Sequence, residues 1–221
     1  MGTTVNAPLV TRNALNGIIY KLKNEYKFDP ITSNIVVPSS VKDIHGTCKT
    51  LVYWNETLFD AGYYTKYSYP WFQLSFPNGL IFPTAYSMRG VSGGYYFPST
   101  WEVLGIPEGK ENEESSWDLL GTNSRSESTY CKTLSSTGNS CNDAVNVGTF
   151  TLKQTSKGYK HLRWRLKTVY NNENPYFPSS GVDVYGVLST SLNIFKKKMT
   201  IVCNGFCIAS KFIFPHWLST S

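Results

Sequence analysis

The chain has 221 residues, of which 41% are hydrophobic, so it is long enough to bury a full core as one main domain with tails. Aromatic residues make up 15%, and Tyr, Phe, Trp, Val, Ile and Thr recur in short runs between Gly, Pro, Asn and Ser, which is typical of strands and turns. The net charge of +6 is spread along the chain. This argues against nucleic-acid binding and leaves only weak attraction to acidic surfaces.

Two features bear on the cellular compartment. Residues 1–20 contain no continuous apolar stretch of signal-peptide length, because polar residues such as Asn6, Arg12 and Asn16 interrupt it. Five cysteines leave at least one unpaired, which favours a reducing compartment, although a bridge between Cys131 and Cys141 outside the cell is an alternative. We therefore expect a cytoplasmic protein.

The first predicted elements are two strands around a turn. Residues 72–76 alternate apolar and polar side chains, Pro77-Asn78-Gly79 has turn composition, and residues 80–91 continue as a strand. An antiparallel pair is therefore expected. Residues 99–106 predict a third strand, and the acidic stretch 107–116 after it predicts a solvated loop.

The second half of the chain contains three more predicted strands. Ser, Thr, Asn and Gly dominate residues 122–147, which predicts an irregular excursion with little core. Strands are expected at residues 148–152, 161–170 and 181–188. The middle one alternates most clearly and should be half buried, with apolar residues on one face and Arg or Lys on the other.

These patterns predict an all-β protein, since no run of more than about ten residues has a convincing helical period. We expect one antiparallel β-sandwich over residues 16–188, after an N-terminal extension of residues 1–15. Trp101, Trp117 and Trp164 should belong to its core, because they lie within alternating runs.

The C-terminal tail, residues 189–221, has a different composition. Lys196-Lys197-Lys198 precedes an apolar stretch, residues 199–218, that Asn, Gly, Lys, Pro and His interrupt. It falls short of the ~20 apolar residues that a membrane span needs. A hairpin or partly ordered tail is expected, and a membrane-associating tail is the alternative.

Catalysis has little support in the sequence. Gly90-Val91-Ser92-Gly93-Gly94 matches the nucleophile-elbow pattern of hydrolases, but Pro98 follows where that elbow needs a helix. A serine esterase using Ser92 is therefore a remote alternative, and a Gly-rich loop is favoured.

Metal and cofactor chemistry also lack a clear motif. Cys203, Cys207 and His216 offer three ligands without a fourth, so core thiols and a surface histidine are the default interpretation. No cofactor is expected, and the sequence leaves open whether a divalent cation such as calcium braces a loop.

Several local phrases resemble the coagulation-factor type C, or discoidin, family, and the sequence is most similar to divergent members from protists. The phrases are Tyr69 to Phe76, Leu80 to Arg89, Pro98 to Gly105 with Ser116 to Leu120, His161 to Leu166, and Val182 to Gly186. The resemblance implies a jelly-roll sandwich of the galactose-binding-like kind. It departs from extracellular members, whose ends a disulfide commonly joins, because the early cysteine is Cys48 and none lies near Leu188.

The resemblance also implies a ligand site among loops at one end of the sandwich, here approximately residues 39–48, 54–69 and 89–97. Aromatic rings can stack on sugar faces, and Arg, His and Asp can bond hydroxyl groups. The candidate ligand-binding residues are His45, Trp54, Asp60, Tyr63, Tyr64, Tyr67, Arg89, Tyr95 and Tyr96.

These residues predict a non-catalytic module that binds a glycan or a protein partner, with no nucleic acid and no membrane association expected. The same rings also suit packing of the sandwich edge. The alternative function is an intracellular scaffold that docks through a sheet face or through the tail.

Overall fold

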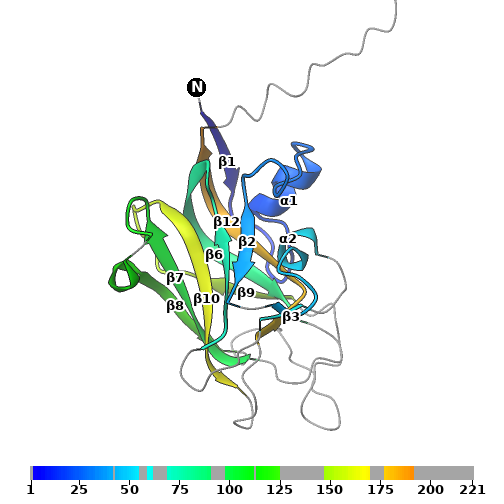
Figure 1. Ribbon diagram of the computed structural model, residues 1–221. Helices are drawn as coiled ribbons and strands as arrows, with labels where there is room; N and C mark the ends of the chain where they lie inside the picture. Colours follow the sequence, from blue (N-terminus) through cyan, green and yellow to red (C-terminus); the bar gives the residue numbers. More distant parts are fainter. Residues whose placement is uncertain are drawn as a thin grey trace, which may run out of the picture.

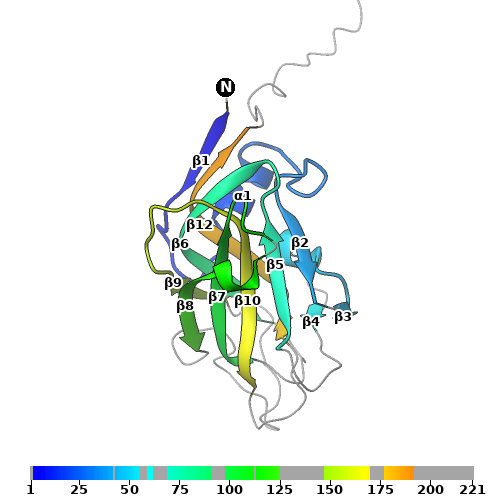
Figure 2. The ribbon, with the colours of Figure 1, turned by 60° about the vertical axis from the view of Figure 1, so that its left-hand side comes forward.

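The computed structural model describes residues 2–41, 43–54, 59–61, 69–90, 98–111, 113–124, 147–169 and 177–191. Strands dominate these residues, and nine of the strands form one antiparallel sheet that curls into two facing layers (Figures 1 and 2). The predicted all-β sandwich is confirmed. Among the described residues, no helix is long and apolar enough to cross a membrane.

One layer has the strand order β8-β7-β10-β5-β2, and the other has the order β1-β12-β6-β9. A pairing of Tyr159 in β10 with Ile81 in β6 joins them. The strands span Thr3–Ala7 (β1), Val37–Ser40 (β2), Trp71–Ser75 (β5), Gly79–Arg89 (β6), Pro98–Pro107 (β7), Asp118–Ser124 (β8), Val147–Thr151 (β9), Tyr159–Val169 (β10) and Gly181–Thr190 (β12).

A second, three-stranded sheet and two short helices complete the described fold. The small sheet has the order β11-β4-β3 and is formed by Phe177–Ser179, Phe59–Ala61 and Asp43–His45. The helices are α1, Ile18–Asn24, and α2, Thr50–Tyr53, with a 3-10 turn η1 at Glu114–Ser116. Both α1 and α2 contact β12.

The core between the layers is aromatic. Trp101, Trp164 and Tyr86 are fully buried, and Phe72 stacks on Trp164 with ring centroids 5.2 Å apart. The predicted alternation of β10 is confirmed, because Leu162, Trp164 and Leu166 are buried while the residues between them are not. Such large side chains hold the layers together through buried apolar area.

The expected pairing of the strands around Pro77-Asn78-Gly79 is wrong. The turn exists, since the Gly79 amide bonds the Phe76 carbonyl at 3.1 Å, and so do both strands. However, β5 pairs with β10 and β2, whereas β6 pairs with β12 and β9. The turn therefore carries the chain from one layer to the other, because each strand buries its apolar face from the opposite side.

The structure also adds regular elements that the sequence patterns did not predict. The expected N-terminal extension contains β1, which pairs with β12 from Thr3 to Ala7. Strand β8 continues to Ser124, three residues into the expected irregular excursion, and β9 begins at the last residue of that excursion, Val147. The rest of that excursion, residues 125–146, and the tail from residue 192 onward lie outside the described residues.

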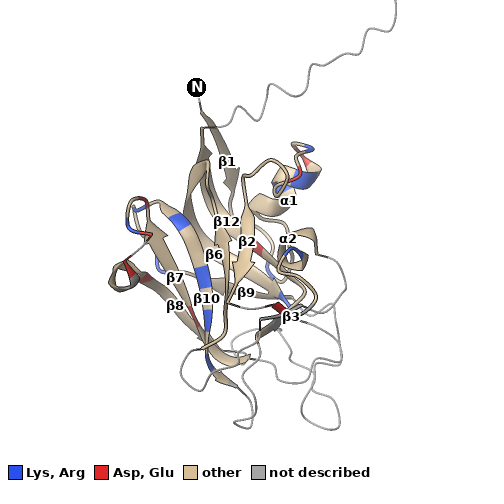
Figure 3. Cartoon of the chain, viewed as in Figure 1, with Lys and Arg blue, Asp and Glu red and all other residues tan. Residues whose placement is uncertain are grey.

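Trp117 is not a core residue, which corrects the prediction for it. It lies just before β8 and is partly exposed, whereas Trp101 and Trp164 are fully buried. The Arg163 guanidinium lies 4.2 Å from the Trp117 ring and 4.1 Å from the Trp71 ring. Trp117 therefore packs a cation on the outer face of β10, where basic residues form the blue segments of that strand (Figure 3).

Candidate functional site

Two of the predicted ligand-binding residues, His45 and Asp60, lie in the small three-stranded sheet. In β3 and β4, His45 pairs with Asp60 across the backbone, so these two candidates lie opposite each other. In turn, β4 pairs with β11, where Phe59 is opposite Ser179. We call this end of the sandwich, defined by β3, β4, β11, Trp54 and Arg89, the loop end.

Trp54 ends α2 in the left-handed conformation, with φ 57° and ψ 35°. Its amide bonds the Thr50 carbonyl at 2.8 Å, and its indole Nε1 donates to the Val182 carbonyl at 3.2 Å. Gly181 makes room for the ring, because a Cβ there would lie 2.8 Å from the Trp54 side chain. The half-buried indole therefore anchors α2 on β12.

Arg89, at the end of β6, ties Trp54 to Ser180, the residue between β11 and β12. Its Nη2 donates to the Trp54 carbonyl at 2.7 Å and to the Ser180 carbonyl at 3.1 Å, and its Nε donates to the Ser180 hydroxyl at 2.8 Å. One planar guanidinium thus fixes the ends of three segments, a geometry that a lysine does not reproduce.

The structure brings His45 together with Asp60 and Trp54 together with Arg89. The side chains of His45 and Asp60 lie outside the described part of the chain. So do the five other candidates, Tyr63, Tyr64, Tyr67, Tyr95 and Tyr96, as well as Ser92 of the Gly-rich loop and the Cys203, Cys207 and His216 cluster. Within the described residues, no three His, Cys, Asp or Glu side chains gather as metal ligands.

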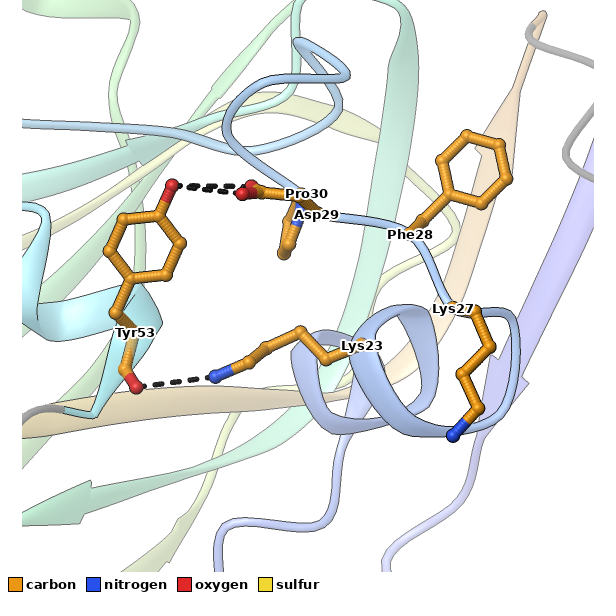
Figure 4. A pocket seen from close by; sticks show the side chains of 6 residues that line it. All are labelled: Lys23, Lys27, Phe28, Asp29, Pro30 and Tyr53. Carbon is orange, nitrogen blue, oxygen red and sulfur yellow. Dashed lines mark hydrogen bonds between the residues drawn. The ribbon is translucent and has the colours of Figure 1, made fainter.

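A pocket of about 320 Å³ lies beside the loop end, between α1 and α2. We call it the helix pocket, and Figure 4 shows its six lining residues: Lys23, Lys27, Phe28, Asp29, Pro30 and Tyr53. The Tyr53 hydroxyl donates to Asp29, with distances of 3.1 and 3.3 Å to the two carboxylate oxygens. Lys23 Nζ donates to the carbonyls of Val52 and Tyr53 at 3.3 and 3.2 Å.

Burial and hydrogen bonds shift the pKa values of Asp29 and Lys23 in the helix pocket. Burial acts to raise the pKa of Asp29, but hydrogen bonds from the Thr32 and Ile31 amides and from the Tyr53 hydroxyl outweigh it and lower that pKa. Burial lowers the pKa of Lys23, against the attraction of Asp183 and Asp29. Lys23 Nζ also lies 4.3 Å from the Trp54 ring centroid, which links the pocket to the loop end.

Asp183 of β12, the strand on which α1 and α2 dock, is a fully buried carboxylate that the sequence patterns did not predict. It accepts hydrogen bonds from the amides of Gly17, Ile19, Tyr20 and Val184. Burial raises its pKa to about 7, although the four amides oppose that shift. A single acidic residue inside an apolar strand was the available signal, since such a group is buried only with partners.

No protein-family model and no curated protein sequence matches the chain. Solved structures do: the F5/8 type C domain of a Bacteroides fragilis protein has a TM-score of 0.50 and 11% identity, covering 72% of this chain and 93% of that one. A CBM32 module from a family 31 glycoside hydrolase of Clostridium perfringens has a TM-score of 0.47 and 10% identity, covering 72% and 99%.

A further CBM32 module from Clostridium perfringens, solved in complex with galactose, has a TM-score of 0.46 and 9% identity, covering 69% of this chain and 93% of that one. At these identities the likeness concerns the fold. The predicted fold is confirmed, because the first of these matches is an F5/8 type C domain. This chain therefore has the fold of a discoidin-like, galactose-binding-like β-sandwich.

Proposed function

We propose that this chain is a non-catalytic glycan-binding module whose site is the loop end. The observation that carries the proposal is the network in which Arg89 joins Trp54 to Ser180, at 2.7 Å to the Trp54 carbonyl and 2.8 Å to the Ser180 hydroxyl. This network fixes the points from which two of the three predicted binding loops leave the sandwich. A binding site needs such a rigid base under its loops.

The roles of the candidate residues differ in this proposal. Arg89 donates to carbonyl and hydroxyl groups of the protein itself, and Trp54 donates its indole proton to Val182. Both are therefore positioning residues. Direct contact with a sugar falls to the tyrosines of the loops, whose rings can stack on pyranose faces while their hydroxyls bond sugar hydroxyls.

A glycan-array screen tests this function. We expect the wild-type protein to bind a defined group of glycans and the double variant Tyr63→Ala with Tyr95→Ala to lose that binding while staying folded. Leu119→Ala is the control, because Leu119 is a 50% exposed residue of β8 that lies outside the loop end. Equal binding by the double variant and the control would contradict the proposed site.

A protein-docking role is the second candidate, and one observation favours it. The outer face of β10 presents Arg163 between Trp71 and Trp117, and Lys167 Nζ lies 5.6 Å from the ring of Tyr69, which is 50% exposed. Trp, Tyr and Arg are the residues enriched at protein interfaces. Absence of glycan binding by the wild type would favour this role over the first.

A further inference from the structure

We propose that this chain forms a twofold dimer in which the outer face of β10 packs against the same face of a second copy. We call this surface the β10 face and define it by Tyr69, Trp71, Trp117, Arg163, Arg165 and Lys167. The proposal names a partner for the protein-docking role described above, and it does not depend on glycan binding at the loop end. It rests on the aromatic centre of this face and on the opposite charges of its two ends.

The centre of the β10 face is aromatic and partly exposed. Arg163 alternates along β10 with the buried Leu162 and Trp164, so its side chain projects outward. The rings of Trp71 and Trp117 pack on its guanidinium at 4.1 and 4.2 Å, and both indoles remain partly exposed. Partly exposed tryptophans around an arginine have the composition of an interface centre.

This centre is preformed. Arg163 Nε and Nη2 donate to the side-chain carbonyl of Gln73 at 3.1 and 3.0 Å, so the guanidinium that both indoles contact is held in place. Because these hydrogen bonds are made within the chain, a partner would contact the rings of Trp71 and Trp117. Little side-chain freedom remains to be lost on association, and this lowers the cost of binding.

The end of the face at the start of β10 is acidic. The segment 107–116, between β7 and β8, carries four glutamates and one lysine. Glu108 pairs with Lys160 at 3.0 Å, and the charge of Glu111 opposes the lowering of the His161 pKa by burial. The acidic segment therefore lies beside the first residues of β10, and Figure 3 shows its red residues at the connection of β7 and β8.

The other end of the face is basic. Lys167 lies about 20 Å from His161 along β10, at the rise of a strand. Arg165 and Lys167 share the carboxylate of Glu102 at 2.7 and 3.2 Å, so these three side chains carry an excess of one positive charge. Lys167 Nζ also lies 5.6 Å from the ring of Tyr69, which is 50% exposed. A cation and an aromatic ring are therefore both presented to a partner at this end.

This charge pattern fits a second copy of the same face. A twofold axis that lies between the two faces and crosses β10 at right angles sets the two β10 strands antiparallel. The acidic segment of each molecule then lies over Arg165 and Lys167 of the other. Each favourable contact forms twice, with opposite charges at both ends. An acidic segment of an unrelated chain would satisfy the basic end alone, so the pattern favours a second copy.

Sedimentation velocity of the full chain tests the proposal. We expect a monomer–dimer equilibrium that shifts toward the monomer when NaCl is raised from about 50 to about 500 mM, since salt screens exposed charges. Lys167→Glu and Glu111→Lys should each weaken dimerisation about tenfold, because each puts like charges opposite one another at two contacts. Lys27→Glu is the matched control, because Lys27 is an exposed lysine just after α1, which docks on the other layer.

A mixture of Lys167→Glu with Glu111→Lys gives the decisive result. In their heterodimer one contact keeps Glu111 opposite Lys167, and the other contains both substitutions with the charges exchanged. We therefore expect the mixture to dimerise like the wild type, although each variant alone dimerises weakly. No recovery in the mixture, or an equal loss in Lys27→Glu, would overturn the proposal. A wild type that stays monomeric would also overturn it, and binding of polyglutamate by that monomer would assign the face to an acidic partner of another kind.

Discussion

The carboxylate of Asp183 accepts a hydrogen bond from the backbone amide of Gly17 at 2.7 Å, across 166 positions of sequence. With the amides of Ile19 and Tyr20 at 2.8 and 3.1 Å, it supplies the partners that the first turn of α1 lacks. Gly17 fits closely there, because a Cβ on it would clash with the Val184 carbonyl. Helix α1 is therefore docked on β12 by one buried side chain.

Asp183→Ala should destabilise the protein by about 3 kcal/mol or more, because buried amides left without an acceptor cost about 1–3 kcal/mol each. Urea unfolding followed by tryptophan fluorescence measures the change. Asp118→Ala is the control, since Asp118 bonds Lys157 and Tyr159 at a partly exposed site. Similar losses in the two variants would mean that the Asp183 contacts contribute little.

The same carboxylate predicts a dependence of stability on pH. Its pKa is raised from 3.8 to about 7 in the folded protein. Between these values the folded state holds a proton that the unfolded chain releases, so this contribution is complete below pH 3.8 and is lost as the pH rises through 7. The slope is at most about 1.4 kcal/mol per pH unit.

Asp183→Asn removes that titration. We expect the free energy of unfolding of the wild type, relative to this variant, to fall between pH 5 and pH 8 when both are measured by urea unfolding. The comparison cancels the other groups, such as His161, whose pKa burial lowers. A constant difference over that range would show that Asp183 stays ionised in the folded state.

Trp101 and Trp117, which the sequence predicted alike as core residues, should contribute very different amounts to the free energy of unfolding. Trp101→Ala should cost about 3–5 kcal/mol, since its side chain is fully buried. Trp117→Ala should cost only about 1 kcal/mol, mostly through the contact with Arg163. Unfolding of Trp117→Ala, Arg163→Met and the double variant gives the coupling energy. No coupling between the two sites would contradict the stacked arrangement.

Arg89→Lys tests the base of the loop end. The variant keeps the charge but cannot make the forked contacts to Trp54 and Ser180, so we expect a loss of about 2 kcal/mol in the free energy of unfolding. Glycan affinity should fall with it if the loop end is the site. Arg165→Lys is the control, because Arg165 pairs with Glu102 on the outer face of β10.

How far the sequence predicts this molecule depends on the range of the interactions involved. Alternation within one strand is local, which is why β10 and its buried face at Leu162, Trp164 and Leu166 were predictable. Strand pairing is not local: the turn at Pro77-Asn78-Gly79 looks like a hairpin, yet its strands enter different layers. Trp117 was misplaced because periodicity does not show that a cation covers one side of a ring.

The candidate sites were predictable in part for the same reason. The discoidin resemblance named Trp54 and Arg89, and the structure brings them into contact, although through the Trp54 carbonyl. The helix pocket escaped prediction, because Lys23 and Tyr53 meet only when two short helices dock on β12. Helices of seven and four residues are too short to show a clear period.

The backbone of Lys27 gives the last prediction. A residue with a Cβ pays about 1 kcal/mol or more in the left-handed region, and glycine does not. Lys27→Gly should therefore raise the free energy of unfolding. Asn34→Gly, at φ 55°, is the matched control and should change the free energy of unfolding little, because asparagine tolerates this conformation.

Thermal and urea unfolding of the two variants decide the point. A gain in stability in Lys27→Gly but not in Asn34→Gly would mean that the left-handed conformation of Lys27 costs the folded protein free energy. A loss of stability in Lys27→Gly alone would instead mean that the side chain supports the turn after α1, which the Phe28 amide closes on the Leu22 carbonyl at 2.8 Å.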